Sequence, residues 1–238
     1  MNQHAVRLGM THTHFNNSTG LPSEGHLTTA RDLSILAQAI IRDFPNHYEM
    51  YSEKEFTFNK IRQSNRNKLL WSDSTVDGLK TGHTEAAGYC LVASAKKDGQ
   101  RLISVILGAS SAKARARESQ KLITYGMRFY ETHSLYDVQE SLAKARIWGG
   151  VEDYIDLVLE RELAVTIPRG QAKYIKATMD INKGIEAPVS AGDIIGKVII
   201  TLDTDVILEQ NLVASKAMPQ GGFFKGLVDS VTRVIMGE

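Results

Sequence analysis

The chain has 238 residues, of which 42% are hydrophobic, and its 28 basic and 27 acidic residues leave a formal net charge of +1. This length allows one large domain or two modest ones, and the charge balance gives no overall basic field of the kind that favours nucleic acid. The single cysteine, Cys90, excludes an internal disulfide framework, and no run of eighteen apolar residues predicts a membrane-spanning helix.

The first residues resemble the end of a helix more than the start of a domain. In MNQHAVRLGM, Ala5 and Leu8 fall on one helical face, and Gly9 stands where helices commonly end with a glycine. No N-cap residue opens this helix, and no secretory signal sequence precedes it. We therefore expect the chain to start inside a larger protein.

A polar loop and a helix are expected next. Residues 10–28 carry turn signals, and Thr28 or Thr29 can cap the helix that follows them. Residues 48–58 then indicate a short, partly exposed segment, and residues 59–71 indicate a polar loop with apolar anchors.

Three strands and a long helix are expected over the next sixty residues. The strands are Val76 to His83, Ala87 to Lys97 and Arg101 to Ala109. The helix covers 110–131 and begins at Ser110 or Ser111. The residues expected on its buried stripe are Leu122, Ile123, Gly126, Phe129 and Tyr130. A meander of strands flanked by helices indicates an α+β fold.

The pattern changes after residue 132. Short alternating strands separated by turn residues predict a small all-β domain over 132–220. Residues 221–238 then predict an amphipathic helix, which either packs on a protein surface or lies in a membrane interface. Its apolar stripe consists of Phe223, Phe224, Leu227, Val228, Val231, Val234 and Ile235.

The triplet Lys80-Thr81-Gly82 lies on the first of the three strands. A lysine ammonium and a threonine hydroxyl together can hold a carboxylate, and a glycine lets a ligand backbone lie against the strand as an added strand. A neighbouring backbone N–H can stabilise an oxyanion. The triplet alone is also compatible with an ordinary solvated strand end.

Other reactive residue types are assigned no chemistry. His12 and His14, with His26 nearby, lack the further ligands of a recognisable zinc site, so we expect hydrogen-bonded loop histidines and no metal. Cys90 lies in an apolar run and is expected to pack in the core rather than act as a nucleophile. No cofactor is expected.

The order of segments around the triplet resembles the low-molecular-mass penicillin-binding proteins, the serine D-alanyl-D-alanine carboxypeptidases. The segments that carry the resemblance are LGMTHTHFNNSTGL, TTARDLSILAQAIIRDFP, EFTFNKIRQSNRNKLLW, VDGLKTGHTEAAGYCLVASAKKDGQRLISVILG, VTIPRGQ and MPQGGFF. The resemblance implies that 1–131 is the C-terminal portion of a β-lactamase-like catalytic domain. It also implies that 132–220 is the small β-domain and that 221–238 is a membrane-anchor helix.

The resemblance also implies an activity and its residues. Such enzymes remove the terminal D-alanine of peptidoglycan pentapeptides through an acyl-serine intermediate, at the periplasmic face of the bacterial inner membrane. Lys80, Thr81 and Gly82 match the family's motif residues, and the His83 backbone would donate one oxyanion N–H. Arg115 would bind the carboxylate of the substrate, for which a guanidinium is well suited. Alternatively, Arg115 is a solvated helix charge like its neighbour Arg117.

The sequence departs from the family pattern at the nucleophile. Family members combine the triplet with a Ser-x-x-Lys and a Ser-x-Asn motif. Near the triplet, Ser94 to Lys97 and Ser110 to Lys113 have the first spacing but the wrong placement, and no Ser-x-Asn occurs. We therefore expect the chain alone to be inactive and to bind β-lactams covalently only if an upstream part is present. The alternative is a non-catalytic, membrane-associated remnant that binds partners or peptidoglycan; a β-lactamase is disfavoured because it needs no trailing β-domain.

Overall fold

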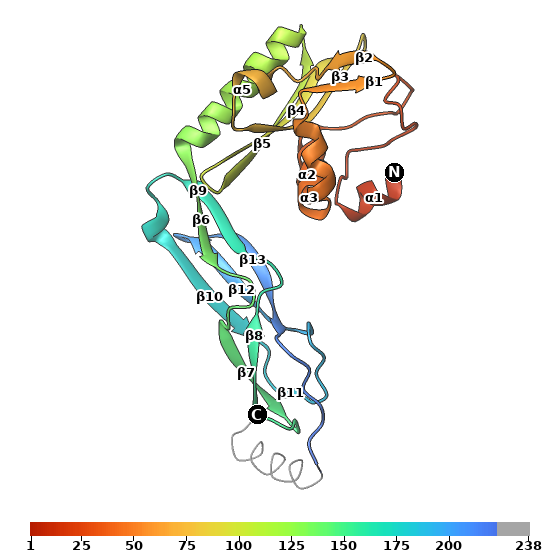
Figure 1. The fold of residues 1–238 in the computed structure, drawn as a ribbon. Coiled ribbons are helices and arrows are strands. Elements are labelled where there is room, and N and C mark those ends of the chain that lie inside the picture. The colour runs from red at the N-terminus through yellow and green to blue at the C-terminus, as the bar shows by residue number, and fades with distance from the viewer. Residues whose placement is uncertain (223–238) are drawn as a thin grey trace. The chain divides into compact units, whose positions relative to one another are not determined.

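The computed structural model describes residues 1–222, and it divides the chain into two compact units, Met1–Phe129 and Tyr130–Glu238 (Figure 1). The predicted apolar stripe and membrane-anchor helix of residues 223–238 lie outside the described residues. Within residues 1–222, no helix combines the length and the apolar character needed to cross a bilayer.

An antiparallel three-stranded sheet forms the centre of the first unit, with the order β3-β4-β5. The strands are β3 (Val76–Thr84), β4 (Gly88–Lys97) and β5 (Gln100–Ala109). The predicted strands are confirmed within two residues at each end. Asp98 and Gly99 have φ angles of 49° and 79°, which is the left-handed geometry of a tight hairpin turn.

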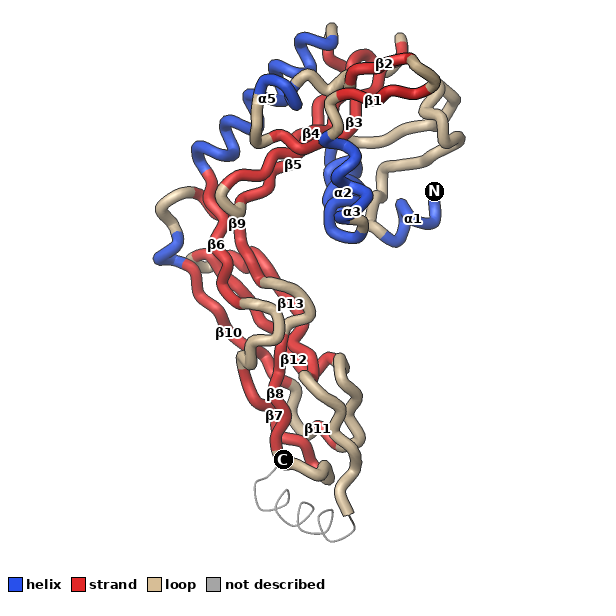
Figure 2. The backbone as a smooth tube through the Cα atoms, viewed as in Figure 1, coloured by secondary structure: helices blue, strands red, loops and turns tan. Residues whose placement is uncertain are grey.

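Helices pack on both faces of this sheet (Figure 2). Ile123 of α5 (Ala112–Phe129) packs with Leu91 and the small residues of β4 in one apolar cluster. Ala37 of α2 (Ala30–Asp43) packs with Leu79 of β3 in another. The sheet therefore lies between the two helices. Strand β3 is an edge strand of this sheet, because it pairs with β4 only.

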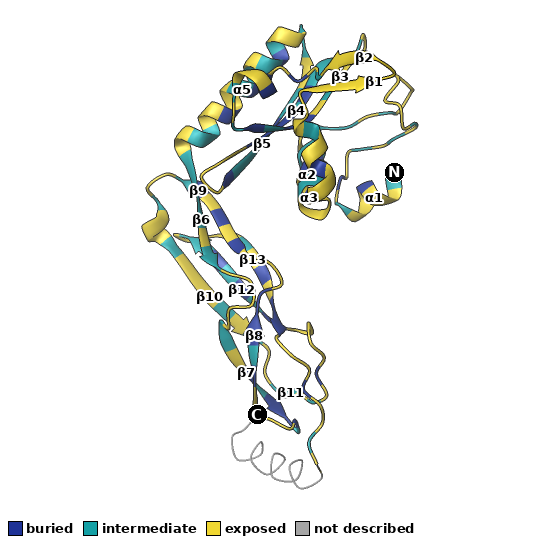
Figure 3. Ribbon diagram, in the orientation of Figure 1, coloured by how far each residue is buried: buried dark blue, intermediate teal, exposed yellow. Residues whose placement is uncertain are grey.

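The buried face of α5 differs from the predicted stripe (Figure 3). Ile123 is 2% exposed, as expected, but Leu122 and Phe129 are 50% and 48% exposed, so the prediction for these two residues is wrong. The buried residues are instead Arg115, Ser119 and Ile123, spaced four apart. Arg115 and Ser119 form hydrogen bonds with groups on the sheet, which makes polar residues compatible with the buried face.

The N-terminal elements agree with their predicted caps. Helix α1 (Asn2–Arg7) is followed by Gly9 with φ 76°, and Thr29 caps α2 by accepting a hydrogen bond from the Asp32 amide. Two short helical turns follow α2. They are α3 (Pro45–Tyr48) and η1 (Glu49–Ser52).

The predicted polar loop over 59–71 is wrong. This stretch belongs to a hairpin and a helical turn, namely β1 (Glu55–Phe58), β2 (Ile61–Ser64) and α4 (Leu69–Ser72). Asn59 and Lys60, with φ angles of 48° and 65°, form the turn between the strands. All eight strand residues of this hairpin are exposed, so the hairpin lacks the alternation of buried and exposed residues that predicts a strand.

The second unit is a β domain with one apolar core. Its strands are β6 (Tyr130–Tyr136), β7 (Ala143–Trp148), β8 (Tyr154–Val158), β9 (Leu163–Pro168), β10 (Ile175–Ile181), β11 (Ile185–Glu186), β12 (Ile194–Leu202) and β13 (Asp205–Ala214), with one 3₁₀ turn, η2 (Ala172–Tyr174). Six strands pair in the order β10-β12-β13-β8-β7-β11, and β6 pairs with β9. Leu157, Leu163, Val198, Ile200 and Leu212 are fully buried between these layers.

Candidate active site

The triplet Lys80-Thr81-Gly82 lies on β3, whose partner β4 occupies one side only. Lys80 and Gly82 are exposed, and the Lys80 ammonium donates a hydrogen bond to the Thr81 carbonyl. Within residues 1–222 no strand pairs with the other edge of β3. The backbone of the triplet is therefore accessible to a ligand along that edge.

A hollow of about 710 Å³ opens beside the triplet. Four segments of the first unit line it, and these are Thr19 and Gly20, Ser64 to Arg66 with Lys68, Lys80 to Thr84 with Tyr89, and Ala112 with Arg115. The hollow thus contains all the residues that the sequence assigned to the triplet site, including His83 and Arg115.

Four cations line this hollow, and no acidic side chain among residues 1–222 joins them. Lys80 comes from β3 and Arg115 from α5, while Arg66 and Lys68 follow strand β2. This arrangement favours an anionic ligand, and carboxylates and phosphates are the common biological anions that arginine can bind through two parallel hydrogen bonds.

Arg66 and Lys68 were not identified from the sequence, because residues 59–71 read as a loop. Their segment is held against β3 by Asn67, which is 1% exposed and whose Nδ2 donates to the Gly78 carbonyl at 2.9 Å. The available signal was the run of seven polar residues, 62–68, just before the apolar pair Leu69 and Leu70, both of which are buried.

Arg115 is buried rather than solvated, being 5% exposed. Its Nη1 donates to the carbonyls of Gly82 at 2.9 Å and Cys90 at 3.2 Å, and its guanidinium lies 5.5 Å from the centre of the Tyr89 ring. Burial lowers the pKa of Arg115, although an arginine remains a cation in proteins. The alternative that it is an ordinary helix charge is wrong; Arg117, by contrast, is exposed and pairs with Glu118.

The loop that carries Thr19 and Gly20 to the hollow is fixed by hydrogen bonds. Asn17 Oδ1 accepts from the Thr19 hydroxyl at 2.9 Å and from the Gly20 amide at 2.8 Å. Further back, the buried Asp32 carboxylate accepts from the His12 amide at 2.9 Å and from the Thr13 hydroxyl at 2.6 Å. The first turn of α2 therefore holds the start of this loop in place.

The histidines of this loop form local hydrogen bonds. His12 Nδ1 is 2.9 Å from the Thr11 hydroxyl, and His26 Nδ1 accepts from the Asn16 amide at 3.1 Å. The backbone of His14 pairs with Leu27. Among residues 1–222, no three metal-ligating side chains are grouped as a cation would require.

The serines with the Ser-x-x-Lys spacing do not line the hollow. Ser94 is fully buried on β4 and accepts a hydrogen bond from Arg101 Nη1 at 2.6 Å, and Ser110 precedes α5. A third match, Ser141 to Lys144, lies in the second unit, where the Ser141 hydroxyl donates to Asp156.

Cys90 is half-buried, so the prediction that it packs in the core is wrong. It borders a second hollow of about 300 Å³ between α2 and the sheet, where its neighbours include Leu36 and Leu91. Its thiol lies 3.4 Å from the Ala87 carbonyl. This hollow is mostly apolar, although Lys80 also lines it and Arg115 Nη1 donates to the Cys90 carbonyl.

Two family models match the chain. The D-alanyl-D-alanine carboxypeptidase model matches residues 1–111, and the model of the penicillin-binding protein 5 C-terminal domain matches residues 130–220.

Curated proteins and solved structures agree with these matches. The D-alanyl-D-alanine carboxypeptidase DacA of Escherichia coli K12 is 43% identical over 233 residues, covering 97% of this chain and 58% of that protein. DacA of Haemophilus influenzae is 38% identical and covers 100% of this chain and 61% of that protein. The crystal structure of penicillin-binding protein 5 from H. influenzae superposes with a TM-score of 0.79 at 39% identity, covering 92% of this chain and 64% of that one. The chain thus spans about three fifths of the length of the curated relatives it matches.

Proposed function

The chain belongs to the D-alanyl-D-alanine carboxypeptidase family, and on this basis we propose that its first unit binds the D-Ala-D-Ala end of peptidoglycan peptides. In this role it supplies the substrate-binding wall of a serine carboxypeptidase that removes the terminal D-alanine. The single observation that supports the proposal most directly is the cationic hollow along the free edge of β3.

Each part of this wall has a chemical role in the proposal. The substrate backbone pairs with β3 as an added strand, a mode in which main-chain hydrogen bonds give affinity. The terminal carboxylate is bound by the Arg115 guanidinium and by Lys80 with Thr81. The His83 amide donates a hydrogen bond to the carbonyl oxygen of the scissile bond, where negative charge develops in acyl transfer. Gly82 leaves room for the ligand backbone to approach.

Peptide binding tests the proposal without requiring turnover. Isothermal titration should show that an N-acyl-D-Ala-D-Ala peptide binds and that the matching C-terminal amide, which lacks the carboxylate, binds at least about tenfold more weakly, a difference of about 1.4 kcal/mol. Lys80→Met should weaken binding of the acid and leave the amide nearly unchanged. Equal affinity for the acid and the amide would contradict the proposal.

We also propose that residues 1–238 alone do not hydrolyse such peptides. The family's acyl-serine route needs a serine that is activated by a base beside the scissile carbonyl. Ser94 is buried, and Ser94, Ser110 and Ser141 are not among the residues that line the hollow, so we infer that none of them meets this requirement. A fluorescent penicillin should therefore leave no covalent label after denaturation. A denaturation-resistant adduct would overturn this part of the proposal.

A non-catalytic role in the cell envelope is the second candidate. It is favoured by the same observation, since a binding wall whose lining serine, Ser64, is not followed by the lysine of a Ser-x-x-Lys motif can retain a peptidoglycan peptide without cleaving it. Peptide binding together with the absence of penicillin labelling is the result that this candidate requires. Both candidates place the protein at the periplasmic face of the inner membrane. Attachment there through residues 221–238 rests on their apolar sequence pattern alone.

A further inference from the structure

Arg115 contacts the backbone of the triplet strand as well as the hollow. Its Nη1 carries two N–H groups, and they donate to the carbonyls of Gly82 and Cys90. Gly82 and Cys90 are directly opposite each other in the β3–β4 register. Within residues 1–222, Nε and Nη2 of Arg115 have no hydrogen-bond partner, so they remain available to a ligand.

These two bonds show where the Gly82 carbonyl points. Opposite residues in an antiparallel pair direct their backbone groups either toward each other or toward the two outer sides of the pair. One nitrogen can reach both oxygens at 2.9 and 3.2 Å only if the carbonyls converge. The Gly82 carbonyl therefore points from β3 toward β4.

The direction of the Gly82 carbonyl determines the direction of the next amide. In a planar trans peptide the C=O and the N–H point to opposite sides, so the His83 N–H points away from β4. That side is the unpaired edge of β3 that borders the hollow. The same alternation places the Thr81 carbonyl, which accepts from Lys80, on this edge.

We propose that Arg115 is a positioning residue, which acts together with the pairing of Gly82 and Cys90 to hold the plane of the Gly82–His83 peptide so that the His83 N–H faces the ligand. The role of the His83 N–H as an oxyanion donor rests on the function proposed above. The positioning of this N–H by Arg115 does not. The hydrogen bond at the Gly82 carbonyl also polarises this peptide group and strengthens its N–H as a donor.

The surroundings of Arg115 explain why an arginine suits this role. The side chain is 5% exposed and its guanidinium lies beside the Tyr89 ring, which in turn contacts the His83 ring at a centroid separation of 3.9 Å. Buried in this way, the planar guanidinium is held in one orientation. A lysine ammonium can also donate to two carbonyls, but its stem is shorter and more flexible, and it has no second nitrogen that stays free for a ligand.

The sequence allows a direct spectroscopic test. It contains two Gly-His pairs, Gly25-His26 and Gly82-His83, so protein labelled with ¹³C-carbonyl glycine and ¹⁵N-histidine gives two peptide cross-peaks in a carbonyl–nitrogen correlation spectrum. The ¹⁵N shift of a peptide group responds to hydrogen bonding at its own carbonyl. In the ligand-free protein, Arg115→Lys should move the His83 cross-peak several-fold more than the His26 cross-peak.

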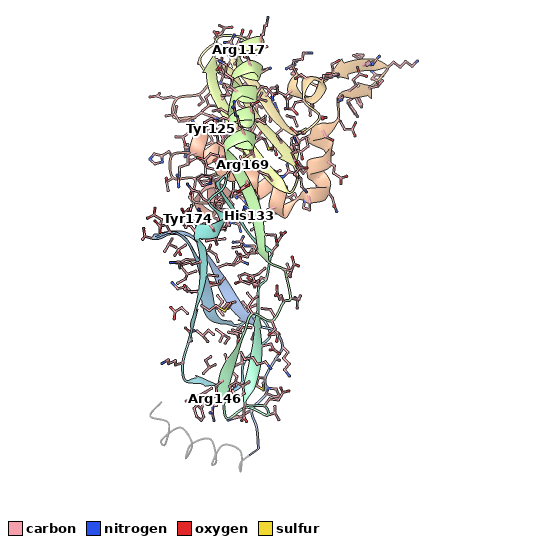
Figure 4. All side chains as sticks on the ribbon, turned by 90° about the vertical axis from the view of Figure 1, so that its left-hand side faces the viewer. Arg117, Tyr125, His133, Arg146, Arg169 and Tyr174 are labelled. Atoms are coloured by element: carbon pink, nitrogen blue, oxygen red, sulfur yellow. The ribbon has the colours of Figure 1, made fainter. Side chains whose placement is uncertain are left out.

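Chemical rescue separates positioning from general disruption. Arg115→Ala should move the His83 cross-peak in the same way, and ethylguanidinium at a concentration that does not denature the protein should move it back. Arg117→Lys is the matched control, since Arg117 lies two residues along α5 on its exposed side (Figure 4), and it should leave both cross-peaks in place. Arg115→Met preserves the apolar stem and provides a further folded variant if Arg115→Lys is unstable.

The outcomes are distinct. A His83 cross-peak that stays in place when Arg115 is replaced, with His26 also unmoved, would overturn the proposal. A shift that ethylguanidinium does not reverse would also overturn it, because a general rearrangement would then explain the change. Since no ligand is present, a failure here leaves peptide binding untouched, and a failure of peptide binding leaves this result untouched.

Discussion

The hydroxyl of Tyr48 lies so close to Gly78 that a Cβ atom on residue 78 would come within 2.5 Å of it. Tyr48 is buried at the end of α3, and its hydroxyl donates to the Asp77 carboxylate at 2.8 Å. Burial also raises the pKa of Tyr48, so the phenol stays protonated and keeps this hydrogen bond. The contact fixes α3 against β3 two residues before Lys80.

Gly78→Ala should therefore destabilise the protein by about 1–3 kcal/mol, the usual cost of placing an extra methyl in a closely packed site. Thermal unfolding followed by circular dichroism measures the change. Gly82→Ala is the matched control on the same strand, because the nearest atom to its added Cβ is 3.9 Å away. Its stability should stay within about 0.5 kcal/mol of the parent protein. Equal unfolding temperatures for the two variants would contradict the prediction.

The same Gly82→Ala variant should bind peptide poorly. The protein has room for the methyl group, but the methyl would lie where the ligand backbone is proposed to approach β3. The expected affinity for N-acyl-D-Ala-D-Ala is at least about tenfold lower, which corresponds to about 1.4 kcal/mol. Titration calorimetry on the folded variant measures it. An unchanged affinity would show that the ligand does not lie against Gly82.

Asp32 predicts a pH dependence of the first unit. The hydrogen bond from Thr13, followed by that from the His12 amide, holds the pKa of Asp32 below its usual value. A lowered carboxylate pKa contributes stability above the unfolded pKa of about 3.9, and this contribution is lost as the pH falls through the lower folded pKa. Asp32→Asn should therefore be less stable than the parent at neutral pH, and the difference should shrink as the pH falls below about 4.

Unfolding temperatures at neutral and acidic pH measure this effect. Glu24→Gln is a suitable control, because Glu24 is exposed on the same loop and its side chain has no hydrogen bond among the described residues. Its difference from the parent should be small at every pH. A constant gap between Asp32→Asn and the parent across the acidic range would contradict the assignment.

The sequence predicted the regular parts of the fold because their patterns are local. The three strands and the Thr29 cap each follow from a period or a capping residue that is visible in a short window. The buried face of α5 was not predictable in this way. Arg115 and Ser119 are polar, and only their bonds to groups on the sheet make them inward-facing residues.

The candidate site was predicted only where a motif marked it. The triplet and Arg115 were found through the family resemblance, and the hollow brings them together. Arg66 carried no motif, and its place depends on the Asn67 bond to Gly78, eleven residues away in the chain. Thr19 likewise reaches the hollow through a loop whose course is set by Asn17 and Asp32. Such long-range constraints are not visible as a periodic pattern.

Ser94 has the spacing of a nucleophile motif and a structural role. It is fully buried and accepts a hydrogen bond from Arg101, which also pairs with Asp77 at 2.8 Å. Ser94→Ala should destabilise the protein by about 1–3 kcal/mol, because an N–H of Arg101 loses its partner. Binding of N-acyl-D-Ala-D-Ala should be unchanged. A fluorescent penicillin adduct that disappears in Ser94→Ala would instead identify Ser94 as the nucleophile.

The second unit should fold without the first. Its own strands enclose one large apolar core, which includes Ile155, Leu163, Val198 and Leu212, each at most 1% exposed. The first unit exposes apolar side chains, among them Phe56 and Phe58 at 65% and 67%, and its β1–β2 turn carries Lys60. A core enclosed by its own elements gives independent stability, whereas an exposed hairpin with a basic turn residue is a preferred site of trypsin cleavage.

Limited trypsin digestion should therefore cut the first unit early and leave a resistant fragment close to residues 130–220. The same fragment, expressed alone, should unfold in one cooperative thermal transition. Lys60→Gln, which removes the cleavage site at the β1–β2 turn, should slow the first cut and leave the resistant fragment unchanged. Digestion of both units at the same rate, or a non-cooperative transition of the isolated fragment, would show that the β domain depends on the first unit for its stability.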